Sequence, residues 1–126
     1  MSGAPRILIV EDSTMVRITV KRTLTAVDFE VDEARDGVEG LSKAKDSIAA
    51  PYDLVLTDLN MPNMDGLTMI QEIRQLIPYA EVPIVMLTTE SGEEKKNVGH
   101  EAGVSAWLVK PFEPDELVEM VGGMLF

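Results

Sequence analysis

The chain has 126 residues, of which 45% are hydrophobic and 26% charged, as expected for one globular domain with its own core. Its formal net charge of −11 argues against direct binding to nucleic acid, whose phosphates most of the surface would repel. The absence of cysteine excludes disulfides and thiolate metal sites. No apolar run is long enough for a signal peptide or a membrane span, so we expect a cytoplasmic, monomeric protein without membrane contact.

Five short segments have the composition of β-strands. Four are largely apolar runs, typical of strands covered on both faces, whereas the second is polar enough for an edge strand. The predicted strands are Arg6–Val10, Glu30–Ala34, Asp53–Thr57, Ile84–Leu87 and Ser105–Val109.

Helical periodicity follows each predicted strand. Ser13 suits the N-cap of the first helix, whose apolar positions extend to Val27. The fourth helix, Glu90–Gly103, is predicted to be weak, because each glycine inside it costs about 1 kcal/mol relative to alanine. The apolar faces of the other helices run through Val38–Ile48, Leu67–Ile77 and Asp115–Met124.

Strict alternation of strands and helices predicts a parallel five-stranded sheet with right-handed crossovers, a doubly wound α/β fold. We find no linker, repeat or low-complexity tract, so residues 1–126 are expected to form one domain with a loose tail at residues 1–5. In such sheets ligands bind at the carboxyl ends of the strands, and the chain places its polar residues there.

Three carboxylates follow two of these strand ends. Glu11 and Asp12 come after the first strand. Asp58 follows the third, and the Pro and Gly after it suggest that it is displayed rather than buried. If the two strands are neighbours, the carboxylates repel one another. A hard divalent cation relieves that repulsion, and Mg²⁺ tolerates a site with few carboxylates and several waters.

Thr88 and Lys110 follow the fourth and fifth strands, and their hydroxyl and ammonium groups could hold phosphoryl oxygens. Phosphoryl transfer requires mainly positioning and neutralisation of charge, which Mg²⁺ and Lys110 would provide. Asp58 is then the obvious acceptor, forming an acyl phosphate.

Each of these residues also has a simpler interpretation. Asp58 could merely start a turn, and Glu11 and Asp12 could cap the first helix. Thr88 could be a strand-end β-former and Lys110 a solvated lysine. Their coincidence at matching strand ends favours the phosphoryl-transfer interpretation.

The same residues resemble the receiver domain of two-component response regulators. The resemblance rests on Glu11-Asp12, Asp58 within LVLTDLNMPNMDG, Thr88 within IVMLTT, and Lys110-Pro111-Phe112, and it covers almost the whole chain. It is most similar to the stand-alone receivers of chemotaxis, which have no attached output domain. The family implies a flavodoxin-like fold with five helices and strand order 2-1-3-4-5.

The resemblance also implies roles for the residues. Asp58 would accept a phosphoryl group from the phosphohistidine of a sensor histidine kinase. Asp12, Asp58 and the backbone carbonyl of Asn60 would bind Mg²⁺, with Glu11 assisting through water. Lys110 would pair with phosphoryl oxygens, Thr88 would move to bond one of them, and the Lys110–Pro111 peptide would be cis.

Two residues depart from the family pattern. Glu11 is one methylene longer than the Asp that commonly begins the acidic pair, which leaves its direct or water-mediated role open. Trp107 replaces the usual Tyr or Phe that swings inward when the threonine moves. Its indole is larger, so Trp107 is either a switching aromatic or only a packing residue.

The function implied is a phosphorylation-controlled switch that binds a downstream protein, such as a flagellar motor switch or another phosphotransfer protein. A phosphorelay intermediate or a phosphate sink are alternatives. A metal-dependent phosphohydrolase with an aspartyl-phosphate intermediate is disfavoured. Such enzymes have a second Asp as general acid at the position of Asn60, and an amide cannot usefully donate that proton. A dinucleotide-binding module is disfavoured because no Gly-x-Gly-x-x-Gly follows the first strand.

Overall fold

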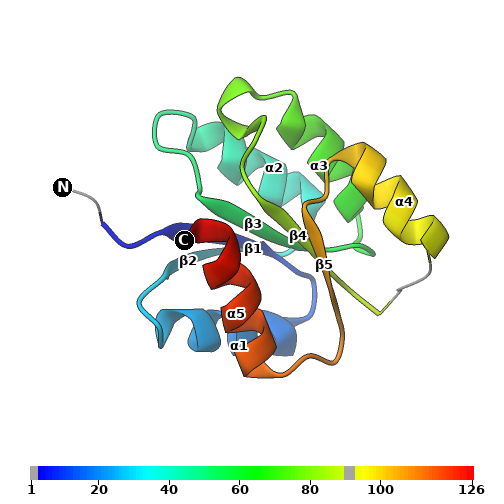
Figure 1. Ribbon diagram of the computed structural model, residues 1–126. Helices are drawn as coiled ribbons and strands as arrows, with labels where there is room; N and C mark the ends of the chain where they lie inside the picture. The colour runs from blue at the N-terminus through cyan, green and yellow to red at the C-terminus, as the bar shows by residue number, and fades with distance from the viewer. Residues whose placement is uncertain (1–2, 90–92) are drawn as a thin grey trace.

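The computed structural model describes residues 3–89 and 93–126. They contain a five-stranded parallel sheet with strand order β2-β1-β3-β4-β5 (Figure 1). The sheet and its order are as predicted, and the strand ends shift by one residue at most from the sequence prediction. The strands are β1 Arg6–Val10, β2 Glu30–Ala34, β3 Leu54–Asp58, β4 Ile84–Thr88 and β5 Ala106–Val109.

Helices cover both faces of the sheet, with α1 and α5 on one face and α2, α3 and α4 on the other (Figure 1). Residues 90–92, the start of the predicted fourth helix, lie outside the described residues. Within the described ranges, no helix has the length and apolar character needed to cross a membrane. The helices are α1 Thr14–Thr25, α2 Gly37–Asp46, α3 Gly66–Arg74, α4 Glu93–Ala102 and α5 Pro114–Leu125, with a short 3-10 helix, η1, at Ile77–Tyr79.

Side-chain caps fix where three helices begin. Ser13, Asp36 and Asp65 precede α1, α2 and α3, and each side chain accepts a hydrogen bond from a backbone N–H in the first turn. These bonds satisfy donors that have no partner within the helix. The caps thereby set where the loops between strands and helices end, on the edge of the sheet where the polar residues lie.

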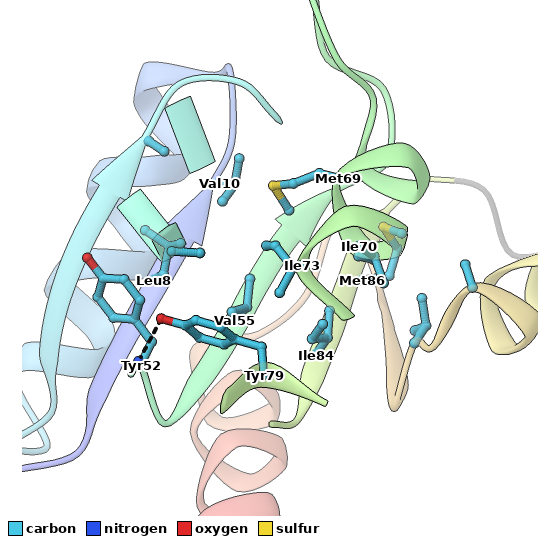
Figure 2. Close-up of a cluster of buried hydrophobic side chains, with 14 of the residues drawn as sticks. Leu8, Val10, Tyr52, Val55, Met69, Ile70, Ile73, Tyr79, Ile84 and Met86 are labelled. Atoms are coloured by element: carbon cyan, nitrogen blue, oxygen red, sulfur yellow. Dashed lines mark hydrogen bonds between the residues drawn. The ribbon is translucent and has the colours of Figure 1, made fainter. Parts of the chain in front are cut away.

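The core has two layers because successive residues of a strand point to opposite faces. Along β1, Leu8 and Val10 pack toward α2 and α3, whereas Ile7 and Ile9 pack toward α1 and α5. Figure 2 shows the first layer, in which the Tyr79 hydroxyl accepts a hydrogen bond from the Tyr52 backbone N–H at 3.2 Å. Burial on both faces explains why β1 is a continuous apolar run, as the sequence indicated.

Four apolar residues assigned to buried helix faces are exposed instead: Val27, Val38, Ile48 and Ile77. Three of them lie beyond the helix ends, since α1, α2 and α3 end at Thr25, Asp46 and Arg74. Leu76 is extended, with φ −80° and ψ 120°, so the helical path is interrupted before Ile77, which begins the separate η1 turn. The periodicity therefore overestimated the helix lengths.

Candidate functional site

The carboxylates of Glu11, Asp12 and Asp58 meet at one edge of the sheet. β1 and β3 are paired neighbours, with Val10 opposite Thr57, so the residues that follow lie side by side. One oxygen from each of the three carboxylates lies within 4.8 Å of the others. The structure thus brings together three acidic residues that the sequence assigned to one site.

The three carboxylates differ in burial. Glu11 is 1% exposed and Asp58 is 9% exposed, whereas Asp12 is exposed to solvent. The expectation that Asp58 is displayed rather than buried is wrong. β3 lies in the middle of the sheet, and the following loop folds back so that the Gly66 N–H bonds the Leu59 carbonyl at 2.8 Å.

Lys110 extends from the end of β5 across the ends of β4 and β3. Its Nζ lies 2.5 Å from Glu11 Oε1 and 3.4 Å from Asp58 Oδ1, and its side chain is only 16% exposed. Its backbone N–H donates to the Thr88 carbonyl at 2.9 Å, and the Lys110–Pro111 peptide is cis, as the resemblance implies. A cation therefore lies against two of the three carboxylates, which excludes a solvated lysine.

The Glu11 carboxylate is held by specific partners rather than serving as a helix cap. Burial raises the pKa of Glu11, the Asp58 charge adds to the rise, and bonds from Lys110 and the Ser13 N–H oppose it. Oε2 accepts from the Ser13 N–H at 3.0 Å, while the Ser13 hydroxyl caps α1 by accepting from Val16 N–H. Ser13, not Glu11, is thus the N-cap, as predicted.

Arg17 supports the acidic loop, and the sequence analysis missed it. Its guanidinium Nη1 donates to the carbonyls of Glu11 at 2.8 Å and Asp12 at 3.3 Å, and its Nε lies 3.5 Å from Glu33 Oε1. The only signal was a basic residue one turn after the N-cap, a pattern shared with ordinary surface arginines. The contact fixes the backbone from which the two carboxylates project.

The loop after Asp58 is docked onto the beginning of α2. Asn63 Nδ2 donates to Asp36 Oδ2 at 2.7 Å, and the Gly37 N–H donates to the Met64 carbonyl at 3.2 Å. Bonds from the Glu39 N–H and the Asn63 amide lower the pKa of Asp36. Asp36 and Gly37 thus anchor the loop of the site.

Gly66 allows this loop to pass close to Asp58. A Cβ at position 66 would lie closer than 3.0 Å to the Asp58 carbonyl oxygen and 3.2 Å from the Leu59 Cα. Both are backbone atoms that cannot rotate away. The glycine is therefore required by the close approach of the chain to itself behind the carboxylate.

The remaining predicted residues lie around this cluster or away from it. Thr88 ends β4 and is buried, at 1% exposure, and Asn60 is exposed in the loop after Asp58. Trp107 is half-buried on the face of the sheet covered by α2, α3 and α4, so it does not join the acidic edge. A switching role of Trp107, which the sequence left open beside a packing role, would therefore not involve direct contact with the carboxylates.

The donor set fits a hard divalent cation. Carboxylate oxygens are the ligands that Mg²⁺ prefers, and it commonly binds one or two carboxylates and several waters. Asp12 is exposed enough to admit such waters, while Lys110 neutralises part of the charge on the buried pair. The cluster can therefore hold a metal ion and an anionic oxygen side by side.

Comparisons with known proteins identify the family of this chain. The family model described as "Response regulator receiver domain" matches residues 7–122. The chain is similar to the chemotaxis protein CheY1 of Helicobacter pylori, with 38% identity over 115 residues, covering 90% of this chain and 91% of that protein.

Solved structures are similar over nearly the whole chain. The Vibrio cholerae chemotaxis protein CheY4 has a TM-score of 0.92 and 39% identity, covering 98% of this chain and all of that one. The receiver domain of a Pseudomonas aeruginosa sensor histidine kinase, solved with magnesium coordinated in its active-site cleft, has a TM-score of 0.87 and 27% identity, covering 98% of both chains. The chain therefore belongs to the family of response regulator receiver domains and is a CheY-like signalling domain.

Proposed function

We propose that this receiver domain transfers a phosphoryl group from the phosphohistidine of a sensor histidine kinase to Asp58 in a Mg²⁺-dependent reaction. An Asp58 carboxylate oxygen forms the new P–O bond, and the electron pair of the broken P–N bond stays on the kinase histidine. The observation that carries the proposal is the Lys110 ammonium 3.4 Å from Asp58 Oδ1, inside a cluster of three carboxylates.

The residues divide the work of positioning and charge neutralisation. Asp12, Asp58 and the backbone carbonyl of Asn60 would hold Mg²⁺, which when bound offsets the negative charge of the approaching phosphoryl group. Glu11 would act through water, because its Oε1 is already 2.5 Å from Lys110. Lys110 would bind a phosphoryl oxygen once the group is on Asp58.

The phosphorylated domain would then change its affinity for a downstream protein. Thr88 would turn to bond a phosphoryl oxygen, and a change at β4 can propagate to Trp107 on the neighbouring strand β5. The likeness to CheY proteins favours a chemotaxis partner, such as a flagellar motor switch, or another phosphotransfer protein. We expect a cytoplasmic monomer that does not bind nucleic acid, given the net charge of −11.

Phosphorylation by a small donor tests this proposal without the kinase. Acetyl phosphate and Mg²⁺ should add one phosphoryl group to the wild-type protein, detected by intact mass, and a chelator should prevent it. Asp58→Asn should abolish labelling. Asp65→Asn is the matched control, because Asp65 caps α3 through a bond that asparagine can also make. Equal labelling of Asp58→Asn and the wild type would contradict the proposal.

A further inference from the structure

Gly99 in α4 lies directly against the indole ring of Trp107 in β5. A Cβ built at Gly99 would lie closer than 3.0 Å to the Trp107 Cζ2, 3.2 Å from Cε2 and 3.3 Å from Cη2. Gly99 is buried, and the indole is half-buried in the same cluster of side chains. The helix backbone therefore packs closely against the ring at Cζ2, and no residue larger than glycine fits while both stay in place.

The backbone conformation does not explain this glycine. Gly103, at the end of α4, has a φ of 107° and needs glycine for that reason, but Gly99 lies inside the helix and has no positive φ. Within a helix, glycine is the least favourable residue after proline. The absence of a side chain, rather than conformational freedom, is what position 99 requires.

Hydrogen bonds hold the C-terminal end of α4 in place. Val104 N–H donates to the Gly99 carbonyl at 2.9 Å, closing the helix. Arg74 of α3 then donates from Nη2 to the Gly103 carbonyl at 2.6 Å, and from Nη1 to the carbonyls of Tyr79 at 2.8 Å and Val82 at 2.6 Å. Because the helix end is held by these bonds, crowding at position 99 would displace the indole.

The indole also lies on the same face of the sheet as Thr88. Trp107 is opposite Met86 in the pairing of β4 with β5, and Thr88 follows Met86 by two residues, so their side chains share a face. Met86 and Trp107 belong to one cluster of packed side chains. A change in the rotamer of Thr88 and a change in the position of the indole can therefore affect each other across two adjacent strands.

We propose that Gly99 is a positioning residue for Trp107: it provides the space in which the indole rests between β5 and α4, and so stabilises the unphosphorylated state. Movement of the indole toward Thr88 would leave the surface of α4 at Gly99 without its packing partner. The packing of α4 would then depend on the state of the indole. The link to phosphorylation rests on the function proposed above, whereas the contact between Gly99 and Trp107 does not.

Gly99→Ala and Gly122→Ala form a matched pair that tests the contact. Both glycines lie in helices, but nothing lies within 4 Å of a Cβ at Gly122. Gly122→Ala should raise the thermal midpoint through helix propensity and leave tryptophan emission unchanged. Gly99→Ala should lower the midpoint, and the displaced indole should show red-shifted emission and greater quenching by acrylamide.

Rescue by a smaller ring distinguishes crowding from general damage. In a Trp107→Phe background, the phenyl ring lacks the indole atoms that Gly99 faces, so adding Gly99→Ala should no longer lower the midpoint. If Gly99→Ala raises the midpoint in the wild-type background with unchanged emission, as Gly122→Ala does, the proposal is wrong. If it lowers the midpoint equally in both backgrounds, the indole is not the cause and the proposal is also wrong.

Beryllofluoride, a phosphoryl mimic, tests the link to the switch. Gly99→Ala destabilises only the state in which the indole rests on α4, so with Mg²⁺ present the variant should bind beryllofluoride several-fold more tightly, as measured by calorimetry. Equal affinity of Gly99→Ala and the wild type would overturn the role in switching. If wild-type protein does not bind the mimic, the proposed function and the switching role of Gly99 are both wrong. The tryptophan emission of Gly99→Ala and the rescue by Trp107→Phe still test the contact between Gly99 and Trp107.

Discussion

Lys110 Nζ lies closer to Glu11, at 2.5 Å from Oε1, than to Asp58, at 3.4 Å from Oδ1, and both are ion pairs between described residues. Both partners are largely buried, with Glu11 side-chain exposure of 1% and Lys110 exposure of 16%. The ammonium is thus held beside Asp58 by a carboxylate that the sequence suggested only as a helper for the metal. A phosphoryl group on Asp58 would offer Lys110 a third anionic partner.

This arrangement predicts that only one of two substitutions weakens Mg²⁺ binding. Asp12→Ala removes an exposed carboxylate ligand and should weaken Mg²⁺ binding by at least about tenfold, since even losing an outer partner of a ligand commonly costs about 10- to 100-fold. Lys110→Ala removes a cation and should leave the affinity unchanged or raise it. Calorimetric titration with MgCl₂ measures both. A loss in Lys110→Ala as large as in Asp12→Ala would contradict the assigned roles.

Thr88 is predicted to couple the phosphoryl group to Trp107. Adding beryllofluoride and Mg²⁺ should shift tryptophan emission in the wild type, because the chain contains one tryptophan and it lies on the strand next to Thr88. The shift should be absent in Asp58→Asn, smaller in Thr88→Ala and retained in Thr88→Ser, which keeps the hydroxyl. Unchanged wild-type emission with the mimic bound would show that Trp107 only packs.

Gly66→Ala should destabilise the protein by about 1–3 kcal/mol, because its methyl group would press on the Asp58 carbonyl. The shift of the loop should also slow labelling by acetyl phosphate. Urea denaturation measures the first effect, and intact mass over time measures the second. Gly122→Ala, where the methyl group meets nothing, should be neutral or stabilising. A Gly66→Ala protein as stable and as active as this control would show that the loop tolerates the crowding.

The bond between Asp36 and the site loop predicts a dependence of stability on pH. Hydrogen bonds from the Glu39 N–H and the Asn63 amide to the ionised form lower the pKa of Asp36 below the usual value of an aspartate. A lowered folded-state pKa means that this stabilisation is present above the unfolded-state pKa and is lost as pH falls through the folded-state pKa. The difference in free energy of unfolding between the wild type and Asp36→Asn should therefore decrease as the pH is lowered below about 4.

Urea denaturation at several pH values from neutral to acidic checks this prediction. The difference should be small, because Asp36 is partly exposed and solvent screens its charge. If the stability advantage of the wild type over Asp36→Asn grew as the pH was lowered, the prediction would be wrong.

The strands were predictable because burial on both faces leaves a strong signal. β1, β3 and β4 are apolar runs whose residues are buried by helices on each side, and the sheet order followed from the resemblance. The helix ends were less predictable. Ile77 continues the helical period past Arg74, but the extended residue Leu76 separates α3 from the η1 turn in which Ile77 lies.

The site was predictable as a set of residues but not as a set of contacts. Lys110 and Glu11 are 99 positions apart, and the sequence could not show which carboxylate the lysine would approach more closely. Arg17 donates to backbone carbonyls of the acidic loop, and Asn63 donates to the capping carboxylate of Asp36. Both contacts depend on the path of the backbone rather than on a sequence motif. The contact of Gly99 with Trp107 likewise needs the helix and the strand in place, although the sequence marked Trp107 and the glycines of the fourth helix as unusual.

Chemical mapping of the phosphorylated residue tests the central claim most directly. Borohydride reduces an aspartyl phosphate to homoserine, so protein labelled by a phosphorylated histidine kinase or by acetyl phosphate can be reduced, digested and sequenced by mass spectrometry. The account predicts homoserine at position 58, and only when Mg²⁺ was present during labelling. Homoserine at another aspartate, or a phosphoryl group that remains on Ser or Thr after reduction, would contradict it.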